Sequence, residues 1–308
     1  MRNTLIVLLL LSGLFSEVYG QQDPQYTQYM YNMNIVNPAY AGSRGTLSIG
    51  VLGRMQWAGI DGAPKTVTMA IHAPVGKNLA AGFSAISDTH GPVKEQNIYA
   101  DFSYTIKTSD QGKLAFGIKG GLTLFDVGLL SVDLPQTPRG VDPLFHDDTH
   151  ETLPNIGAGL YYYTDKFYAG FSAPNIMETK HLEKQGNIIT KASEKMHYFL
   201  TTGYVFTLSQ TLKFKPSTML KAVSGSPLAV DLSANFLFND RLELGASYRF
   251  GDSVGALINF GVTKDLRLGF AYDYTTTELG KYNSGTYEAF LLWDIDFSKK
   301  NLKSPRFF

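Results

Sequence analysis

The chain of 308 residues contains no cysteine. This absence excludes disulfides, thiolate nucleophiles and zinc sites built on cysteine. There is also no excess of either charge, since 27 basic residues balance 27 acidic ones, and nucleic-acid binding would need an electropositive surface. Beyond the first residues, no apolar run approaches the roughly 20 residues that a membrane-spanning helix requires. Helical periodicity is nearly missing throughout the sequence.

The beginning of the chain has the pattern of a secretory signal peptide. Arg2 gives a positive start, residues 5–11 form an apolar core, and Gly20 is a small residue before the expected cleavage site. We therefore predict a signal peptide at residues 1–20 and a mature chain that begins near Gln21. The alternative is a retained membrane helix, which the short apolar run disfavours.

Alternation of apolar and polar residues, the pattern of a strand with two unlike faces, recurs from residue 46 to residue 296. The runs cover residues 46–57, 66–73, 79–87, 97–106, 114–126, 155–164, 167–173, 196–207, 212–223, 228–238, 241–250, 253–263, 266–274 and 286–296. The 30 Gly, 18 Tyr and 20 Phe suit strands that present aromatic side chains outward. We predict an all-β fold, a transmembrane antiparallel β-barrel of about 14 strands, because bacterial outer-membrane barrels have even strand numbers.

The connections alternate in length, as the two rims of such a barrel do. After even-numbered runs the chain turns within a few residues, which is typical of the periplasmic rim. The longer connections, which we expect at the cell surface, are residues 58–64, 88–95, 129–154, 174–195 and 275–284. Both ends of the chain would then lie in the periplasm, with a C-terminal tail at residues 297–308.

The two faces of the runs differ in chemistry. Glu243 and Arg249 alternate with apolar neighbours and should face the lumen, because a charge on the lipid face is costly. Tyr161 and Tyr163 fall near a run end, as do Trp57 and other aromatic residues, and we interpret them as aromatic girdles. A soluble β-sandwich or propeller alternates similarly, but its outer face would be less apolar and a propeller would show a blade-length repeat.

One dense group of possible metal ligands stands between Pro143 and Pro154. Its weak candidates are His146, Asp148, His150 and Glu151. The order lacks the H-E-x-x-H pattern of zinc proteases, so a solvated acidic loop is the favoured interpretation and binding of a divalent cation the alternative. No recognisable catalytic or nucleotide-binding motif is present. We predict no enzyme activity and no cofactor.

Several motifs together resemble one known family. The first are Gln22-Asp23-Pro24-Gln25-Tyr26-Thr27-Gln28-Tyr29-Met30-Tyr31-Asn32 and Asn37-Pro38-Ala39-Tyr40-Ala41-Gly42, followed by residues 54–66, 170–175, 245–249, 272–274, 285–288 and 304–308. These resemble the PorP/SprF family, outer-membrane proteins of the type IX secretion system of Bacteroidota. The resemblance spans essentially the whole mature chain.

The resemblance implies an integral outer-membrane component of protein export, with outer-membrane lipid around it and no nucleic acid as partner. Some members couple the secretion machine to its periplasmic, peptidoglycan-associated part. Others support export and surface retention of a large adhesin, sometimes for gliding, by contacting its C-terminal region. The competing function of another class is a passive or substrate-specific pore, which an intermediate barrel size leaves open.

Residues 21–45 precede the barrel of residues 46–296, and we expect them to form a periplasmic or lumen-entering segment. This segment could plug the barrel or bind partners. The alternative is that it only forms part of the rim and packs against the first strand. The candidates for partner binding are Tyr26, Gln28, Tyr29, Tyr31, Asn32, Asn37, Pro38 and Tyr40. From their length alone, residues 129–154 and 174–195 are expected to offer an outer surface to a secreted partner.

Overall fold

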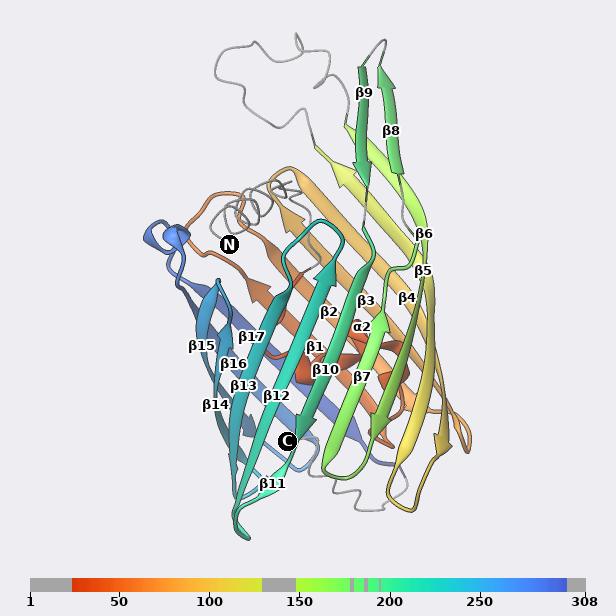
Figure 1. Ribbon diagram of the computed structural model, residues 1–308, viewed down its shortest axis with the longest axis vertical. Helices are drawn as coiled ribbons and strands as arrows, with labels where there is room; N and C mark the ends of the chain where they lie inside the picture. Colours follow the sequence, from red (N-terminus) through yellow and green to blue (C-terminus); the bar gives the residue numbers. More distant parts are fainter. Residues whose placement is uncertain (1–23, 129–147, 178–179, 186–187, 194, 298–308) are drawn as a thin grey trace, which may run out of the picture.

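The computed structural model describes residues 24–128, 148–177, 180–185, 188–193 and 195–297. Within these ranges the chain forms a closed antiparallel barrel of 14 strands (Figure 1). Each strand pairs with its sequence neighbours, β17 pairs with β1, and β10 pairs with β12. The fold class predicted from alternation is therefore confirmed.

The strands have the following bounds. They are β1 (Leu47–Met55), β2 (Lys65–Pro74), β3 (Leu79–His90), β4 (Val93–Lys107), β5 (Lys113–Val127), β6 (Thr149–Tyr163), β7 (Phe167–Ala173), β10 (His197–Tyr204), β12 (Leu212–Val223), β13 (Ala229–Phe238), β14 (Leu242–Arg249), β15 (Ser253–Gly261), β16 (Leu266–Thr275) and β17 (Thr286–Ile295). The short β11 (Phe206–Thr207) continues β10 along β12. A separate hairpin, β8 (Lys180–Gln185) and β9 (Ile188–Ser193), projects from the barrel between β7 and β10 (Figure 1).

All 14 predicted runs correspond to barrel strands, but two predicted connections were wrong in extent. Residues 88–90 and 93–95 belong to β3 and β4, which pair up to His90 and Val93, so the turn between them contains only residues 91–92. Strand β6 begins at Thr149, so the predicted connection of residues 129–154 overlaps it. Both errors have one cause: above the membrane both faces of a strand are polar, and alternation no longer marks the strand.

The outer face of the barrel carries a belt of exposed apolar side chains. The belt includes Phe83, Phe102, Ile118, Leu160, Leu200, Leu232, Ile258, Phe270 and Leu291. An outward apolar band of this kind is the surface that a transmembrane barrel presents to lipid. The predicted inward position of Glu243 and Arg249 is confirmed, since both side chains are buried.

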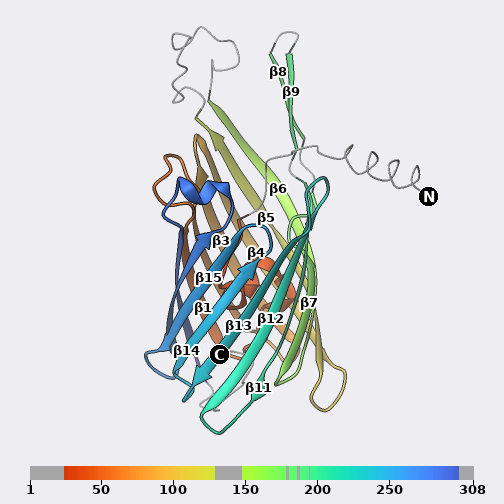
Figure 2. The same ribbon diagram turned by 60° about the vertical axis from the view of Figure 1, so that its left-hand side comes forward.

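The wall of the barrel is uneven in height. Strands β4, β5 and β6 each have 15 residues, whereas β7 has 7 and β14 has 8. The tall strands and the β8–β9 hairpin stand above the rest of the wall on the side of the long connections (Figure 2). Cross-strand rows show where the lipid belt ends there. The row Ile98, Leu122 and Pro154 is followed upward by Gln96, Leu124 and Thr152, and then by Lys94, Asp126 and His150.

Two tyrosines predicted as part of an aromatic girdle face the lumen instead. Tyr161 and Tyr163 are 2% and 4% exposed, and both belong to the buried cluster inside the barrel. They share a face of β6 with Gly157 and Gly159, whose side of the strand faces the lumen. Tyr162, between them, is on the outer face, so the girdle interpretation was wrong for two of the three neighbouring tyrosines.

Candidate functional site

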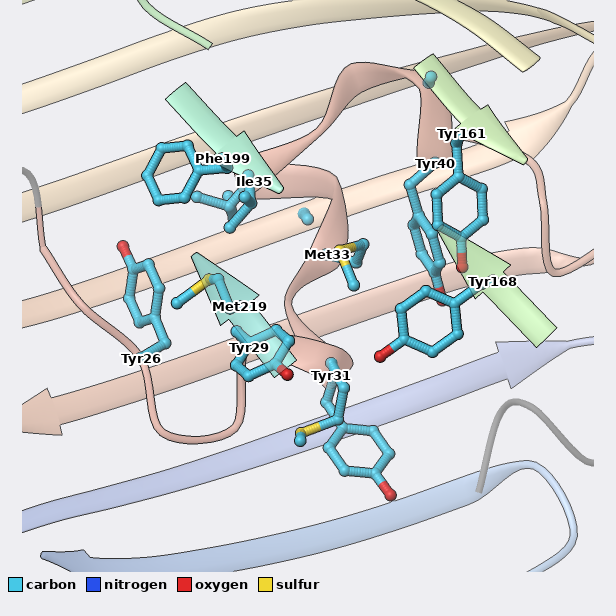
Figure 3. Packing of buried hydrophobic residues seen from close by; sticks show 14 of the residues in the cluster. Tyr26, Tyr29, Tyr31, Met33, Ile35, Tyr40, Tyr161, Tyr168, Phe199 and Met219 are labelled. Carbon is cyan, nitrogen blue, oxygen red and sulfur yellow. The ribbon is translucent and has the colours of Figure 1, made fainter. Parts of the chain in front are cut away.

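The lumen of the barrel is occupied by the chain's own residues 24–46, which we call the lumen segment. It contains three short helical turns, η1 (Tyr29–Tyr31), α2 (Met33–Val36) and η2 (Pro38–Tyr40). No helix in the described ranges is long and apolar enough to cross a membrane. Tyr29 and Ala39 are fully buried. The aromatic and methionine side chains of the segment point into a cluster with Tyr161, Tyr168, Phe199 and Met219 of the wall (Figure 3).

At its first end, the segment is held by a buried group of charges. The main-chain amides of Thr27 and Gln28 donate to Glu288, at 3.0 and 2.8 Å. The guanidinium of Arg54 lies 2.9 Å from Glu288 and 3.2 Å from Asp273, and it also donates to the Thr27 hydroxyl. The side chains of Arg54, Asp273 and Glu288 are at most 5% exposed. The guanidinium and the donors of the segment thus offset the burial of the two carboxylates.

This end lies in the half of the lumen next to the long connections. Arg54 is one residue from the end of β1, which leads into the connection of residues 56–64. The segment then continues toward the opposite rim, where β1 begins at Leu47. Strand β17 ends at the short-turn rim, whereas Thr27 lies in the other half of the lumen. Both ends of the chain lie outside the described residues, so their expected periplasmic position stays a prediction.

A second buried ion pair holds the middle of the segment. Lys119 of β5 lies 3.3 Å from Asp101 of β4, and both side chains are fully buried. Asp101 accepts a hydrogen bond of 3.0 Å from the Asn34 side chain. Lys119 in turn donates to the main-chain oxygens of Asn34 and Ile35. The side-chain nitrogen of Asn34 and two main-chain oxygens of α2 are therefore paired with wall charges at mid-depth.

Glycines of the wall make room for the main chain around η2. A Cβ at Gly117 would lie 2.1 Å from the Ala39 nitrogen, and one at Gly159 would lie 2.1 Å from the Asn37 side-chain oxygen. Asn37 accepts from the Ala39 amide and donates to the Leu160 carbonyl at 2.9 Å. At Gly159 the absence of a side chain thus gives room to a packed group of the lumen. Any larger side chain there would collide with the segment.

The last part of the segment turns into β1 at the short-turn rim. Gly42 has φ +72°, and a Cβ at this position would meet Ala80 at 2.2 Å, so glycine is required on two grounds. Its amide donates to His72 of β2. Arg44 forms a bidentate ion pair with Asp294 of β17, close to the rim. The segment is thus tied to the wall at both ends.

On the wall of β12–β16, the segment meets small polar and charged groups. The Tyr31 hydroxyl donates to Glu243, which also accepts from Asn235 at 2.6 Å and lies 3.4 Å from Arg267. The Tyr31 ring stacks on Phe290. The ammonium of Lys215 also lies over the Tyr31 ring, 5.1 Å from its centroid. A tyrosine is held here by its ring and by its hydroxyl.

The structure brings all the predicted partner-binding residues of the segment together inside the barrel. Tyr26, Gln28, Tyr29, Tyr31, Asn32, Asn37, Pro38 and Tyr40 are all buried. A partner could reach these side chains only if the segment left the lumen. Their role in partner binding stays a prediction.

The candidate metal ligands are spread over different environments. His146 lies outside the described residues, Asp148 precedes β6, and His150 and Glu151 belong to β6 rather than to a loop. His150 faces outward and lies 2.6 Å from Asp126 of β5, whereas Glu151 is on the opposite face. No cluster of three possible metal-binding side chains occurs among the residues that the structure describes.

Sequence reasoning missed the wall residues that hold the segment. Arg54, Asp273 and Glu288 come from three neighbouring strands whose pairing closes the barrel, and only the closed register brings them together. The available signal was the charged residue in each otherwise apolar run, which marks the lumen face. It could not show that the charges meet one another or that Thr27 joins them.

The geometry defines the class of protein: a transmembrane β-barrel whose lumen is filled by a segment from its own N-terminal region. The model of the type IX secretion system membrane protein PorP/SprF family matches residues 18–293, and the chain belongs to this family. The match begins before the lumen segment and includes it.

Solved structures give a general likeness of fold. Similar chains include the outer membrane protein Omp33 of Acinetobacter baumannii, with 9% identity, TM-score 0.46, and coverage of 82% of this chain and 99% of that one. A Pseudomonas aeruginosa FadL homologue has 12% identity, TM-score 0.47, and coverage of 90% and 96%. The Ralstonia pickettii toluene transporter TbuX has 12% identity, TM-score 0.47, and coverage of 84% and 92%. The search of curated proteins gave no match.

Proposed function

We propose that this protein is a non-enzymatic outer-membrane component of the type IX secretion system that supports export and surface retention of a large adhesin-type cargo through protein–protein contacts. Membership of the family supports the link to secretion. The observation that carries the proposal is the filled lumen, because a passive pore needs an open path through the barrel.

The contacts of the lumen segment favour a stable filling over a loosely inserted chain. Its first end is bound by Arg54 and Glu288, its middle by Lys119, and its last part by Asp294. Breaking the contacts at the first end or in the middle would leave buried polar or charged groups without partners, which is costly. A barrel closed in this way acts on other proteins through its rims and loops.

In this proposal the long connections face the cell surface and the short turns face the periplasm, as in other outer-membrane barrels. The adhesin's C-terminal region would meet the long-connection rim, and periplasmic proteins of the secretion system would meet the short-turn rim. An N-terminal signal peptide would direct the chain to export.

The test is a mild-detergent pull-down of the tagged protein from its native outer membrane, with co-purifying chains identified by mass spectrometry. We expect recovery of a large secreted adhesin. Recovery of periplasmic, peptidoglycan-associated components without an adhesin would instead assign the chain to the core of the machine. A barrel that purifies alone and conducts ions in a planar bilayer would contradict the proposal and support a pore.

A further inference from the structure

A row of small residues crosses the lumen face of strands β10, β12, β13 and β14. Gly203 of β10 pairs with Ser217 of β12, which in turn pairs with Ser233 of β13. On its other side Ser233 pairs with Ser247 of β14. All four positions belong to the lumen-facing set of their strands. Small residues leave room in front of a wall, and the groups that face this room decide what it can hold.

Two tyrosine hydroxyls point into this room, one from the lumen segment and one from the wall. Tyr29 of η1 is fully buried, and its hydroxyl lies beside Ser217 and Ser233. Tyr168 of β7 lies across Gly203, where a Cβ would be 2.8 Å from the Tyr168 hydroxyl. This hydroxyl is therefore beside Ser217, the strand partner of Gly203. Figure 3 shows the hydroxyls of Tyr29 and Tyr168 turned toward each other.

The four hydroxyl groups gathered here form what we call the hydroxyl cluster. Its members are Tyr29, Tyr168, Ser217 and Ser233, and all four oxygens are buried. Although they are neighbours, none of them meets another in hydrogen-bond geometry, nor any other protein group in the described part of the chain. A hydroxyl can donate one hydrogen bond and accept two. Leaving several such groups buried without a partner is costly, so another molecule is needed to bind them.

The charges around the hydroxyl cluster are engaged elsewhere, which identifies the ligand as neutral. Asp231 lies near Tyr29, but both of its carboxylate oxygens accept from Arg249, at 2.7 and 3.2 Å. Lys215 lies over the Tyr31 ring. A buried ion would need an opposite charge that is available to it. Water is neutral, both donates and accepts, and typically makes about three hydrogen bonds to buried polar groups.

We propose that the hydroxyl cluster is a binding site for ordered water, which bridges η1 of the lumen segment to strands β7, β12 and β13. The lumen segment then has two unlike faces. Its η2 face is dry, because Gly117 and Gly159 let the wall contact it directly, and its η1 face is hydrated. The inference involves no cargo and no partner protein, so it does not depend on the proposed function.

The direct test is X-ray hydroxyl-radical footprinting of the full-length barrel in detergent. The X-ray pulse converts water in place to radicals that oxidise the side chains next to it, and mass spectrometry locates the products. We expect a several-fold higher oxidation yield at Tyr29 and Tyr168 than at Tyr99. Tyr99 is the matched control because it is 2% exposed and its hydroxyl donates directly to Asn97 at 2.9 Å.

A substitution that fills the site should remove the water. Ser217→Val takes away one hydroxyl and puts apolar atoms into the room between the strands and η1. We expect oxidation of Tyr29 and Tyr168 to fall to the level of Tyr99. The control is Thr218→Val on the outer face of the same strand, which should leave the oxidation of both tyrosines unchanged. Heat-modifiable migration confirms that both variants are folded barrels.

The sign of a stability change gives a second test that needs no filling of the site. Tyr29→Phe removes only the hydroxyl. If this hydroxyl binds water, its loss should lower the urea midpoint of unfolding, as Tyr99→Phe should by losing a direct hydrogen bond. If the hydroxyl has no ligand, its removal relieves a buried polar group, and the midpoint should rise or stay the same.

Three results would overturn the water site. They are oxidation of Tyr29 and Tyr168 no higher than that of Tyr99, unchanged oxidation in a folded Ser217→Val barrel, and a urea midpoint that does not fall in Tyr29→Phe. Higher oxidation that Ser217→Val abolishes, together with a lower midpoint in Tyr29→Phe, would support the site. The proposed function is tested separately by the pull-down and stands or falls on that result.

Discussion

The two sides of the lumen hold the same segment by different means. On the side of β5 and β6, Gly117 and Gly159 let the main chain of η2 approach the wall directly. On the side of β1, β16 and β17, Arg54, Asp273 and Glu288 bind main-chain and hydroxyl groups of the segment. The glycine side depends on shape, and the charged side depends on one guanidinium that is shared by two buried carboxylates. Losing one buried charge should therefore cost more than adding one side chain.

The largest effect is expected on the charged side. Arg54→Met removes the cation and leaves Asp273 and Glu288 buried without it, which should lower the free energy of unfolding by about 3–5 kcal/mol. The measurement is urea unfolding of the detergent-purified barrel, followed by loss of its heat-modifiable form. The matched control combines Arg54→Met with Asp273→Asn and Glu288→Gln, which should recover most of the loss because no charge is left unpaired. Wild-type stability for Arg54→Met alone would show that charge does not hold this side.

The next effect tests the glycine side. Gly117→Val puts a side chain where the Ala39 main chain lies, and we expect a loss of about 2–3 kcal/mol from overpacking. Amide hydrogen exchange of residues 29–41 should become faster as the segment loosens. The control is Gly120→Val on the same strand, where a Cβ would meet nothing within 4 Å. Equal hydrogen exchange in the two variants would show that the space at Gly117 is not needed by the lumen segment.

A smaller effect is expected at the residue that joins η2 to the wall. Asn37→Ala removes the acceptor for the Ala39 amide and the donor to Leu160, at a cost of about 1–2 kcal/mol. The same hydrogen-exchange experiment should show faster exchange at Ala39 and Tyr40 before the rest of the segment changes. Uniform loss of protection across the whole barrel would instead mean that Asn37 supports the wall.

The smallest effect is expected at the rim. The side chain of Asp294 is 23% exposed, so its ion pair with Arg44 is partly screened by solvent. Arg44→Gln should cost less than about 1 kcal/mol, and the difference from wild type should shrink as salt is added. Unfolding curves at low and high ionic strength measure both. A loss as large as that of Arg54→Met would erase the difference between buried and rim charges.

Alternation along the sequence was sufficient to predict the barrel because the lipid belt forces every second residue of each strand to be apolar. Ile118 and Phe116 on β5 are examples, with Lys119 and Gly117 on the lumen face. The same rule fails above the belt. His150 faces water there, and the part of β6 that holds it looks like a loop in the sequence.

The contacts between the lumen segment and the wall could not be predicted from the sequence, for a different reason. The contacts between Thr27 and Glu288, or between Asn37 and Leu160, join residues far apart in the chain, and their register follows only from the closed sheet. Alternation shows which residues share a face of a strand, but it does not show whether that face points to the lipid or to the lumen. For this reason Tyr161 and Tyr163 were assigned to the lipid side. The neighbouring Gly157 and Gly159 were the available sign of a crowded lumen face.

The central claim is that the lumen is closed by the chain's own residues, and conductance in planar bilayers tests it most directly. Wild-type protein and a variant lacking residues 25–42 would be compared after heat-modifiable migration confirms that both are inserted barrels. The account predicts no stable open channel for the wild type and stepwise conductance for the deletion. Equal conductance in the two proteins would contradict it.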